Sequence, residues 1–227
     1  MENKVVVITG ASSGIGATAA ELLAKIGKNA FTIIADMSNR SGVSRVVNET
    51  IKRFGHIDVW INNVGRGITR LPSQLNDEDI EEIMKVNVMS AVYGMQEVLP
   101  HFKSRNSGHV INISSLLGRM PFAVMRSAYC AAKHFLNSLT ATFRDEVQQT
   151  HPGIQFSIVS PGVVRTEFGL NALHGGPDSR QMPDSQSPEE IAEVIAFVIA
   201  SRKPDVYTKK GYKERIDNYY VSLGVDP

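Results

Sequence analysis

The chain has 227 residues, of which 42% are hydrophobic and 21% are charged, and its net charge is +1. This balance gives no electrostatic reason to expect a nucleic acid or an anionic membrane surface as a partner. A chain of this length can bury a large core, so we expect a single domain over residues 1–227.

The sequence gives no sign of a membrane segment or a signal peptide. Its longest apolar run, at about 191–200, is too short to span a bilayer and contains Glu193. The N-terminus leads at once into the short apolar run 4–9. The single cysteine, Cys130, cannot form an internal disulfide, which suits a reducing compartment. We expect a soluble, cytoplasmic protein.

The first motif is a glycine-rich turn between a predicted strand, 4–9, and a predicted helix that runs to about residue 26. The turn reads Gly10, Ala11, Ser12, Ser13, Gly14, Ile15, Gly16. Glycines let a backbone turn tightly, and the free N–H groups of a helix N-terminus attract phosphate. The motif therefore predicts a site for the phosphates of a nucleotide.

Two other interpretations of this turn are possible. Residues 10–14 also fit Gly-x-Ser-x-Gly, the nucleophile turn of hydrolases, with Ser12 as nucleophile. That turn normally follows a central strand and not the first strand of the chain. An NTPase phosphate loop requires a lysine, which is absent here.

Strands and helices alternate along the rest of the chain. Strands are expected at 31–36, 57–61, 109–115, 154–159 and 205–208. Helices are expected at 41–54 and 76–102, around Tyr129 to about residue 149, and from Ser187, an N-cap followed by Pro188, which begins the last helix expected. This alternation predicts an α/β fold, a Rossmann-like doubly wound parallel sheet with helices on both faces. Residues 169–187 are rich in Gly, Pro, Ser and Asp and predict a mobile substrate loop.

Polar clusters follow the carboxyl ends of four predicted strands, at 10–16, 62–65, 114–115 and 160–166. Ligands bind at this edge of an open parallel sheet. Asp36 lies 20 residues after Gly16, the spacing of the acid that binds the ribose of NAD.

Tyr129 and Lys133 lie four residues apart, so a helix places them on one face. A phenol titrates near pH 10 and becomes a useful acid or base near neutrality when a cation favours the phenolate. Lys133 could act as that cation, and Ser115 could hold a substrate oxygen against the phenol. Taken alone, the pair fits equally well an exposed Tyr and Lys on a helix.

Together these motifs resemble the short-chain dehydrogenase/reductase family, classical type, over nearly the whole chain. The matching residues are Thr9, Gly10, Gly14, Ile15 and Gly16, then Asn62 to Gly65, Asn87, Ser115, Tyr129, Lys133, Pro161 and Gly162. The resemblance implies an NAD(P)-dependent oxidoreductase that interconverts a secondary alcohol and a ketone.

The resemblance also implies roles for individual residues. Tyr129 would be the acid/base, Ser115 would orient the substrate, Lys133 would bind the nicotinamide ribose and lower the pKa of Tyr129, and Asn87 would hold a relay water. The cofactor site would comprise Gly10, Ser12, Ser13, Gly14, Ile15, Gly16, Asp36, Met37, Asn63, Val64, Gly65, Tyr129, Lys133, Pro161, Gly162, Val163 and Thr166. A homodimer or homotetramer is implied as well.

One departure from the family lies near residues 27–30, where one βα unit of about 25 residues is missing. Asp36 then corresponds to a later strand end and would contact the adenine, not the ribose. Either the chain is truly short, or these residues exist and the numbering closes over them. We favour the second explanation, since losing an internal strand would disturb the core. The residues that determine the preference for NAD or NADP lie in the missing unit. We expect NADP rather than NAD.

Alternative functions stay open. One is a catalytically idle nucleotide-binding or regulatory protein, and another is an epimerase or lyase on the same scaffold. The six histidines show no metal-ligand spacing, so no metal is expected. The substrate is a small carbonyl compound or alcohol, and Phe122, Met125, Phe168 and Leu170 favour an apolar one.

Overall fold

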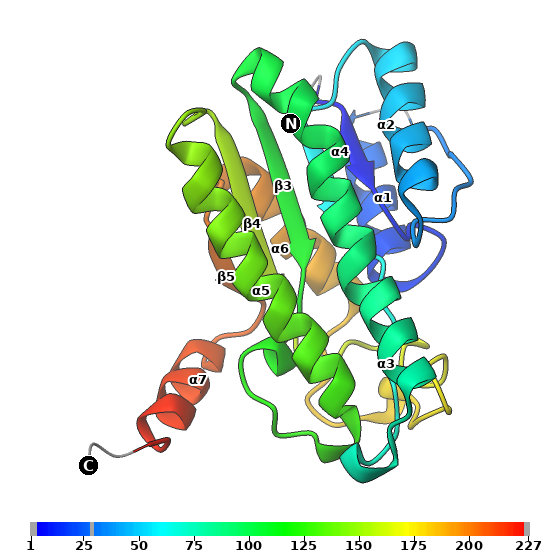
Figure 1. Ribbon diagram of the computed structural model, residues 1–227, viewed down its shortest axis with the longest axis vertical. Coiled ribbons are helices and arrows are strands. Elements are labelled where there is room, and N and C mark those ends of the chain that lie inside the picture. Colours follow the sequence, from blue (N-terminus) through cyan, green and yellow to red (C-terminus); the bar gives the residue numbers. More distant parts are fainter. Residues whose placement is uncertain (1–3, 28–29, 225–227) are drawn as a thin grey trace.

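The computed structural model describes residues 4–27 and 30–224 and shows a parallel sheet between two layers of helices (Figure 1). Five strands lie side by side in their order along the chain, and all four pairings are parallel. They are β1 (Val6–Ile8), β2 (Val59–Asn62), β3 (Gly108–Ile113), β4 (Ile154–Ser160) and β5 (Asp205–Tyr207). The predicted fold class is confirmed.

Helices cover both faces of the sheet because both faces are apolar. Helices α2 (Arg40–Phe54), α4 (Ser90–Arg105) and α5 (Ser127–Gln148) pack with Trp60, Val110 and Phe156 on one face. Helices α1 (Gly14–Gly27) and α6 (Pro188–Ser201) pack with Ile61, Ile111 and Val159 on the other. Figure 1 shows α4 and α5 in front of the strands and α6 behind them.

The long helix predicted at 76–102 forms as three joined segments. Helix α3 (Asp77–Met84) begins at Asn76, whose side chain accepts a hydrogen bond from the Asp79 N–H. A π-helical turn at Lys85–Met89 follows and leads directly into α4. Such turns occur mostly at functional sites.

The predicted strand at 31–36 does not form. Within the described residues no strand pairs with the outer edge of β1, and Phe31 and Ile34 are 48% and 87% exposed. Arg53 of α2 lies over the Phe31 ring at 4.1 Å instead, and Arg45 donates a hydrogen bond to the Ile34 carbonyl. In the doubly wound order the third strand pairs with the second and not with the first. Residues 31–36 therefore have no partner when the second strand is missing.

The described residues thus lack the βα unit that the family resemblance implies. The numbering runs through all 227 residues without a break, and the preference for omitted residues over a truly short chain stays a prediction. Residues 28 and 29, where the gap was placed, lie outside the described part of the chain. The two cores form without the extra strand, and β1 becomes an edge strand.

The segment 169–187, predicted to be mobile, is tied to its surroundings. Leu173 bridges to Ile68, and Gln186 bridges to Val164. The His174 Nε2 lies 2.5 Å from the Asp79 carboxylate, which Arg70 also binds at 2.8 Å. The segment folds over the sheet edge in place of extending away from it.

Two predictions for the C-terminal region are confirmed, and one is wrong. Helix α6 begins at Ser187 with Pro188 at its first position, and Glu190 completes the capping box. Strand β5 forms at the predicted place. The helix from Ser187 is not the last, because α7 (Tyr212–Val221) follows and leans away from the body of the molecule (Figure 1). In the described residues no helix has both the length and the apolar character needed to cross a membrane.

A buried histidine in β3 makes stability depend on pH. His109 is 1% exposed, its Nε2 lies 2.8 Å from Ser157 Oγ, and burial, aided by the positive charge of Arg202, lowers its pKa to about 3. The unfolded chain takes up this proton near pH 6.5 and the folded chain does not, so the free energy of unfolding falls as pH drops below 6.5. We expect a loss of about 2 kcal/mol between pH 6.5 and 5 from this residue.

His109→Gln removes that dependence while keeping a polar partner for Ser157, and urea unfolding at both pH values measures it. His151→Gln, at a half-buried position after α5, is the matched control. An unchanged pH dependence in His109→Gln would contradict the assignment.

The glycine turn depends on close backbone approach at Gly16. A Cβ there would lie 2.4 Å from the Gly10 carbonyl oxygen and 2.5 Å from Asn63 Nδ2. We expect Gly16→Ala to lower the free energy of unfolding by about 1–3 kcal/mol through overpacking. Gly27→Ala, in the same helix with open space around it, should be neutral or stabilising. Equal thermal midpoints for the two variants would refute this account of the turn.

Candidate active site

The carboxyl ends of β1 to β4 bring the predicted polar clusters to one edge of the sheet. Asn63 Nδ2 donates to the carbonyls of Thr9 and Gly10 at 3.1 and 3.2 Å, joining the second cluster to the glycine turn. The Leu116 N–H donates to the Pro161 carbonyl at 2.7 Å, joining the third to the fourth. A Cβ on Gly14 would lie 3.3 Å from the Thr166 side chain, so the fourth cluster returns to the first.

The glycine turn has the conformation expected of a phosphate site. Gly10 and Gly14 have φ of 65° and 55°, a region that favours glycine, and α1 begins at Gly14. Ser12 and Ser13 are exposed at the turn. In the described residues no histidine bonds to Ser12, so the hydrolase interpretation lacks a general base.

Tyr129 lies buried at this edge beside Ser115. Burial raises the pKa of Tyr129 to about 12, although a hydrogen bond with the Ser115 side chain acts in the opposite direction. The Ser115 Oγ also accepts a hydrogen bond from the Leu117 N–H at 3.1 Å, which orients the hydroxyl. Tyr129 is therefore a neutral phenol at physiological pH.

Lys133 lies one helical turn after Tyr129 and is also buried. Its Nζ donates to the Ile113 carbonyl at 3.0 Å and lies 5.6 Å from the centre of the Tyr129 ring. Burial lowers the pKa of Lys133 to about 8. The net shift of the Tyr129 pKa is upward in this structure, because desolvation of the phenol dominates.

Asn87 lies in the π-helical turn and is fully buried. Its Nδ2 donates to the carbonyls of Arg66 and Ile83 at 2.9 and 3.0 Å, and its Oδ1 accepts from the Arg66 N–H at 3.1 Å. A Cβ on Gly65 would lie 3.0 Å from this Oδ1 and 3.5 Å from Lys133 Nζ, so the three residues meet. The structure thus places Asn87 in a polar network and next to Lys133.

Two neighbouring cavities run along the edge. One of about 470 Å³ lies on the side of β1 and is lined by Gly10, Ser12, Ala35, Asp36, Met37, Ser38, Val64, Glu82, Lys85 and Val86. In it the Asp36 carboxylate accepts hydrogen bonds from the Ser38 N–H and from Asn39, and the hydrogen bonds with Ser38 lower its pKa. These hydrogen bonds hold the Asp36 carboxylate against the residues that directly precede α2.

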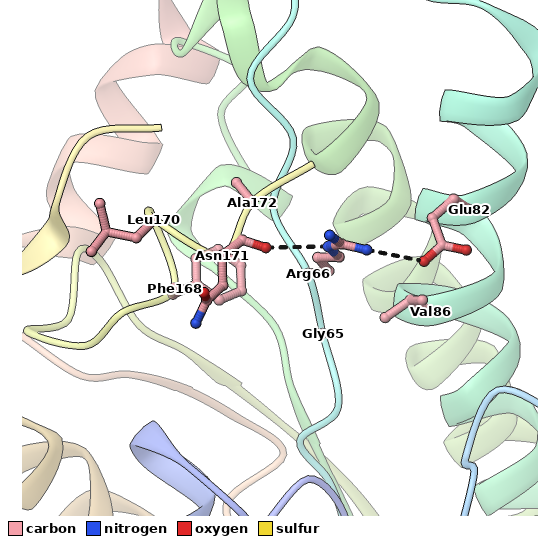
Figure 2. A pocket seen from close by; sticks show the side chains of 8 residues that line it. All are labelled: Gly65, Arg66, Glu82, Val86, Phe168, Leu170, Asn171 and Ala172. Carbon is pink, nitrogen blue, oxygen red and sulfur yellow. Dashed lines mark hydrogen bonds and ion pairs between the residues drawn. The ribbon is translucent and has the colours of Figure 1, made fainter. Parts of the chain in front are cut away.

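The second cavity, of about 580 Å³, lies between Gly65 and the loop 168–172 (Figure 2). Figure 2 shows Arg66 between the Asn171 carbonyl, 3.2 Å from its Nε, and the Glu82 carboxylate, 3.4 Å from its Nη1. Phe168 lines this cavity, and its ring meets the Tyr129 ring edge-on at 5.7 Å between centroids. The loop therefore reaches the predicted acid/base.

Sequence reasoning included Arg126 in the segment 119–126 expected to shape the pocket but did not single it out. It stands directly before α5, and its Nη1 donates to the Ile68 carbonyl at 3.0 Å. Its place three residues before Tyr129 was the available signal. Cys130 is buried, which raises its pKa to about 11, as expected for a packed residue and not a nucleophile.

The residues fit a nicotinamide dinucleotide unequally. The glycine turn, Asn63 and the buried set around Tyr129 fit its pyrophosphate and nicotinamide end. The wall beyond β1, where the adenosine ribose would lie, lacks its strand. In the described part of the chain no cluster of three or more His, Cys, Asp or Glu side chains could hold a metal ion.

Comparison with known proteins agrees with this arrangement. The family model described as short chain dehydrogenase matches residues 18–174. An NADP-dependent 3-hydroxy acid dehydrogenase of Schizosaccharomyces pombe is 31% identical, with 89% of each chain covered. A dehydrogenase/reductase SDR family member 7B of Danio rerio is 31% identical, covering 91% of this chain and 77% of the relative.

A solved structure shows the same fold. A short chain dehydrogenase/reductase from Burkholderia phymatum, in complex with NAD, has a TM-score of 0.86 and 22% identity over 99% of this chain and 97% of its own. At this identity the likeness speaks for the fold alone.

The alignment lengths also show that the relatives have residues without a counterpart in this chain. The match to the S. pombe protein spans 234 positions, whereas 89% of 227 residues is about 202, so about 32 positions have no counterpart here. That is the size of one βα unit. The motifs, the parallel sheet and these matches show that the chain belongs to the short-chain dehydrogenase/reductase family of oxidoreductases.

Proposed function

We propose that the chain is an NAD(P)-dependent oxidoreductase that interconverts a secondary alcohol and a ketone. The observation that carries the proposal is the buried Tyr129, hydrogen-bonded to Ser115 and one turn from Lys133, at the same sheet edge as the glycine turn. Family membership and the relatives' names support the class of reaction.

The proton chemistry follows from the state of Tyr129. The nicotinamide, when bound, gives or accepts a hydride. A phenol with a pKa of about 12 keeps its proton at neutral pH and can donate it to the oxygen of a ketone as that oxygen gains charge. Ser115 would hold the same oxygen by its hydroxyl. A protonated Tyr129 therefore suits ketone reduction at neutral pH, and a deprotonated Tyr129 suits alcohol oxidation.

Lys133, together with a water held by Asn87, would return a proton from solvent to Tyr129. The Lys133 ammonium, 5.6 Å from the ring centre, would stabilise the phenolate left after donation. Asn87 and Gly65 adjoin Lys133, which supports a relay on that side of the residue. In the proposal the Lys133 ammonium also binds the nicotinamide ribose.

We propose NADP(H) ahead of NAD(H) as cofactor. The side chain of Asp36, the residue at the NAD spacing, is engaged by Ser38 and Asn39, which argues against a ribose contact. The name of the S. pombe relative supports NADP, and the B. phymatum structure contains NAD. Gly10 to Gly16, Met37, Asn63 to Gly65, Pro161 to Val163 and Thr166 would form the rest of the site.

The idle binding protein and the epimerase or lyase are weaker candidates. A binding protein has no need of a buried Tyr, Ser, Lys and Asn set, and no described feature favours an epimerase or lyase. Assembly as a homodimer or homotetramer, through the helices that carry Asn87 and Tyr129, stays a prediction.

The test is Tyr129→Phe. We expect turnover of NADPH with a ketone substrate to fall by about 10²- to 10⁴-fold, the usual contribution of an acid/base, while NADPH still binds. A panel of small ketones with absorbance at 340 nm measures turnover, and calorimetric titration measures binding.

Tyr93→Phe on α4 is the control, because the Tyr93 ring lies under the Arg40 guanidinium, outside the set around Tyr129, and its loss of a phenol should leave turnover unchanged. Equal turnover in wild type and Tyr129→Phe would reject the assigned acid. Binding without any wild-type turnover would favour the idle protein.

A further inference from the structure

Arg126 is a half-buried cation without an acidic partner. Its Nη1 donates to the Ile68 carbonyl at 3.0 Å, and in the described residues no carboxylate lies within 4.0 Å of its guanidinium. The other two arginines of this region are paired, Arg66 with Glu82 at 3.4 Å and Arg70 with Asp79 at 2.8 Å. A buried charge without a countercharge is costly in free energy. An anion from outside the chain would therefore stabilise Arg126.

The guanidinium lies beside the predicted acid/base. A Cβ on Gly67 would lie 2.7 Å from Arg126 Nη1 and 3.1 Å from the Phe168 ring. The same Phe168 ring meets Tyr129 edge-on. Arg126 and Tyr129 are three residues apart, and the charge of Arg126 lowers the pKa of Tyr129 against the effect of burial. The positive charge of Arg126 therefore acts on the phenol of Tyr129.

The Thr69 hydroxyl lies close to the Arg126 guanidinium, beside Gly176. A Cβ on Gly176 would lie 2.9 Å from Arg126 Nη2 and 2.8 Å from Thr69 Oγ1. The Thr69 hydroxyl is buried and has no hydrogen-bond partner among the described residues. A guanidinium has five N–H donors, and most of those of Arg126 are unused. Buried polar groups left unpaired in this way indicate a ligand that would pair them.

We propose that Arg126, assisted by Thr69, binds the carboxylate of an oxo-acid or hydroxy-acid substrate and so determines specificity for anionic substrates. The inference rests on the proposed function, since it names the substrate class of the same site. One guanidinium balances one negative charge, which suits a carboxylate better than a phosphate dianion. This anionic substrate class differs from the apolar substrate that the sequence favours.

The experiment compares oxo acids of four to six carbons with their methyl esters, which keep the ketone and lose the charge. We expect the wild-type kcat/KM to be about 10- to 100-fold higher for the acid, the worth of a charge-assisted hydrogen bond. In Arg126→Gln the ratio should fall to about one, mainly through KM. Arg126→Lys should keep part of the preference.

Arg180→Gln is the matched control, because Arg180 lies in the predicted substrate loop 169–187 but is exposed and paired with Asp178. Thermal midpoints establish that each variant folds. A wild-type preference for the esters, or an acid preference that survives in folded Arg126→Gln, would overturn the proposal.

Calorimetric binding separates this inference from the proposed function. If no ketone is turned over, the proposed function fails, yet titration of the acids and esters still decides the role of Arg126. Binding of the acid that is lost in Arg126→Gln supports it. Equal binding of acid and ester by the wild-type protein contradicts it.

Discussion

A buried chain of amides holds the sheet and the helices in register, and the site depends on it. Asn62 and Asn112 are partners across β2 and β3, and Asn62 Nδ2 donates to Asn112 Oδ1 at 2.8 Å. Asn112 in turn donates to Thr140 of α5 at 2.7 Å, and Asn62 donates to the Ala91 carbonyl of α4 at 3.3 Å. Because buried amides must be paired, these bonds fix both helices relative to the strands. The helix segments that carry Asn87, Tyr129 and Lys133 therefore reach the sheet edge in a fixed arrangement.

The other end of the sheet is built differently. Without a strand beyond β1, the cavity near Asp36 is bounded by the segment 35–38 and by α3 and its π-helical turn. Both hydrophobic cores remain complete, since α1 and α6 cover one face of the strands and α2, α4 and α5 the other. The lost unit thus changes the adenosine side of the site and leaves the side around Tyr129 intact.

The sequence predicted most of the fold because alternating apolar runs and capping residues act locally. Ser187, Pro188 and Glu190 mark the start of α6 without reference to the rest of the chain. The strand at 31–36 failed because β propensity cannot act without a neighbouring strand. Motif order made Tyr129, Ser115, Lys133 and Asn87 the candidate site residues. The raised pKa of Tyr129 and the unpaired charge of Arg126 depend on burial and tertiary contacts, which no local pattern contains.

The central claim is that the cofactor site survives the loss of a sheet strand. Calorimetric titration of the full chain with NADPH, and separately with NADH, tests it most directly. The account predicts saturable binding of NADPH at one site per chain, with weaker binding of NADH. No saturation with either nucleotide up to millimolar concentrations would contradict it, and would mean that the missing βα unit is required for the cofactor to bind.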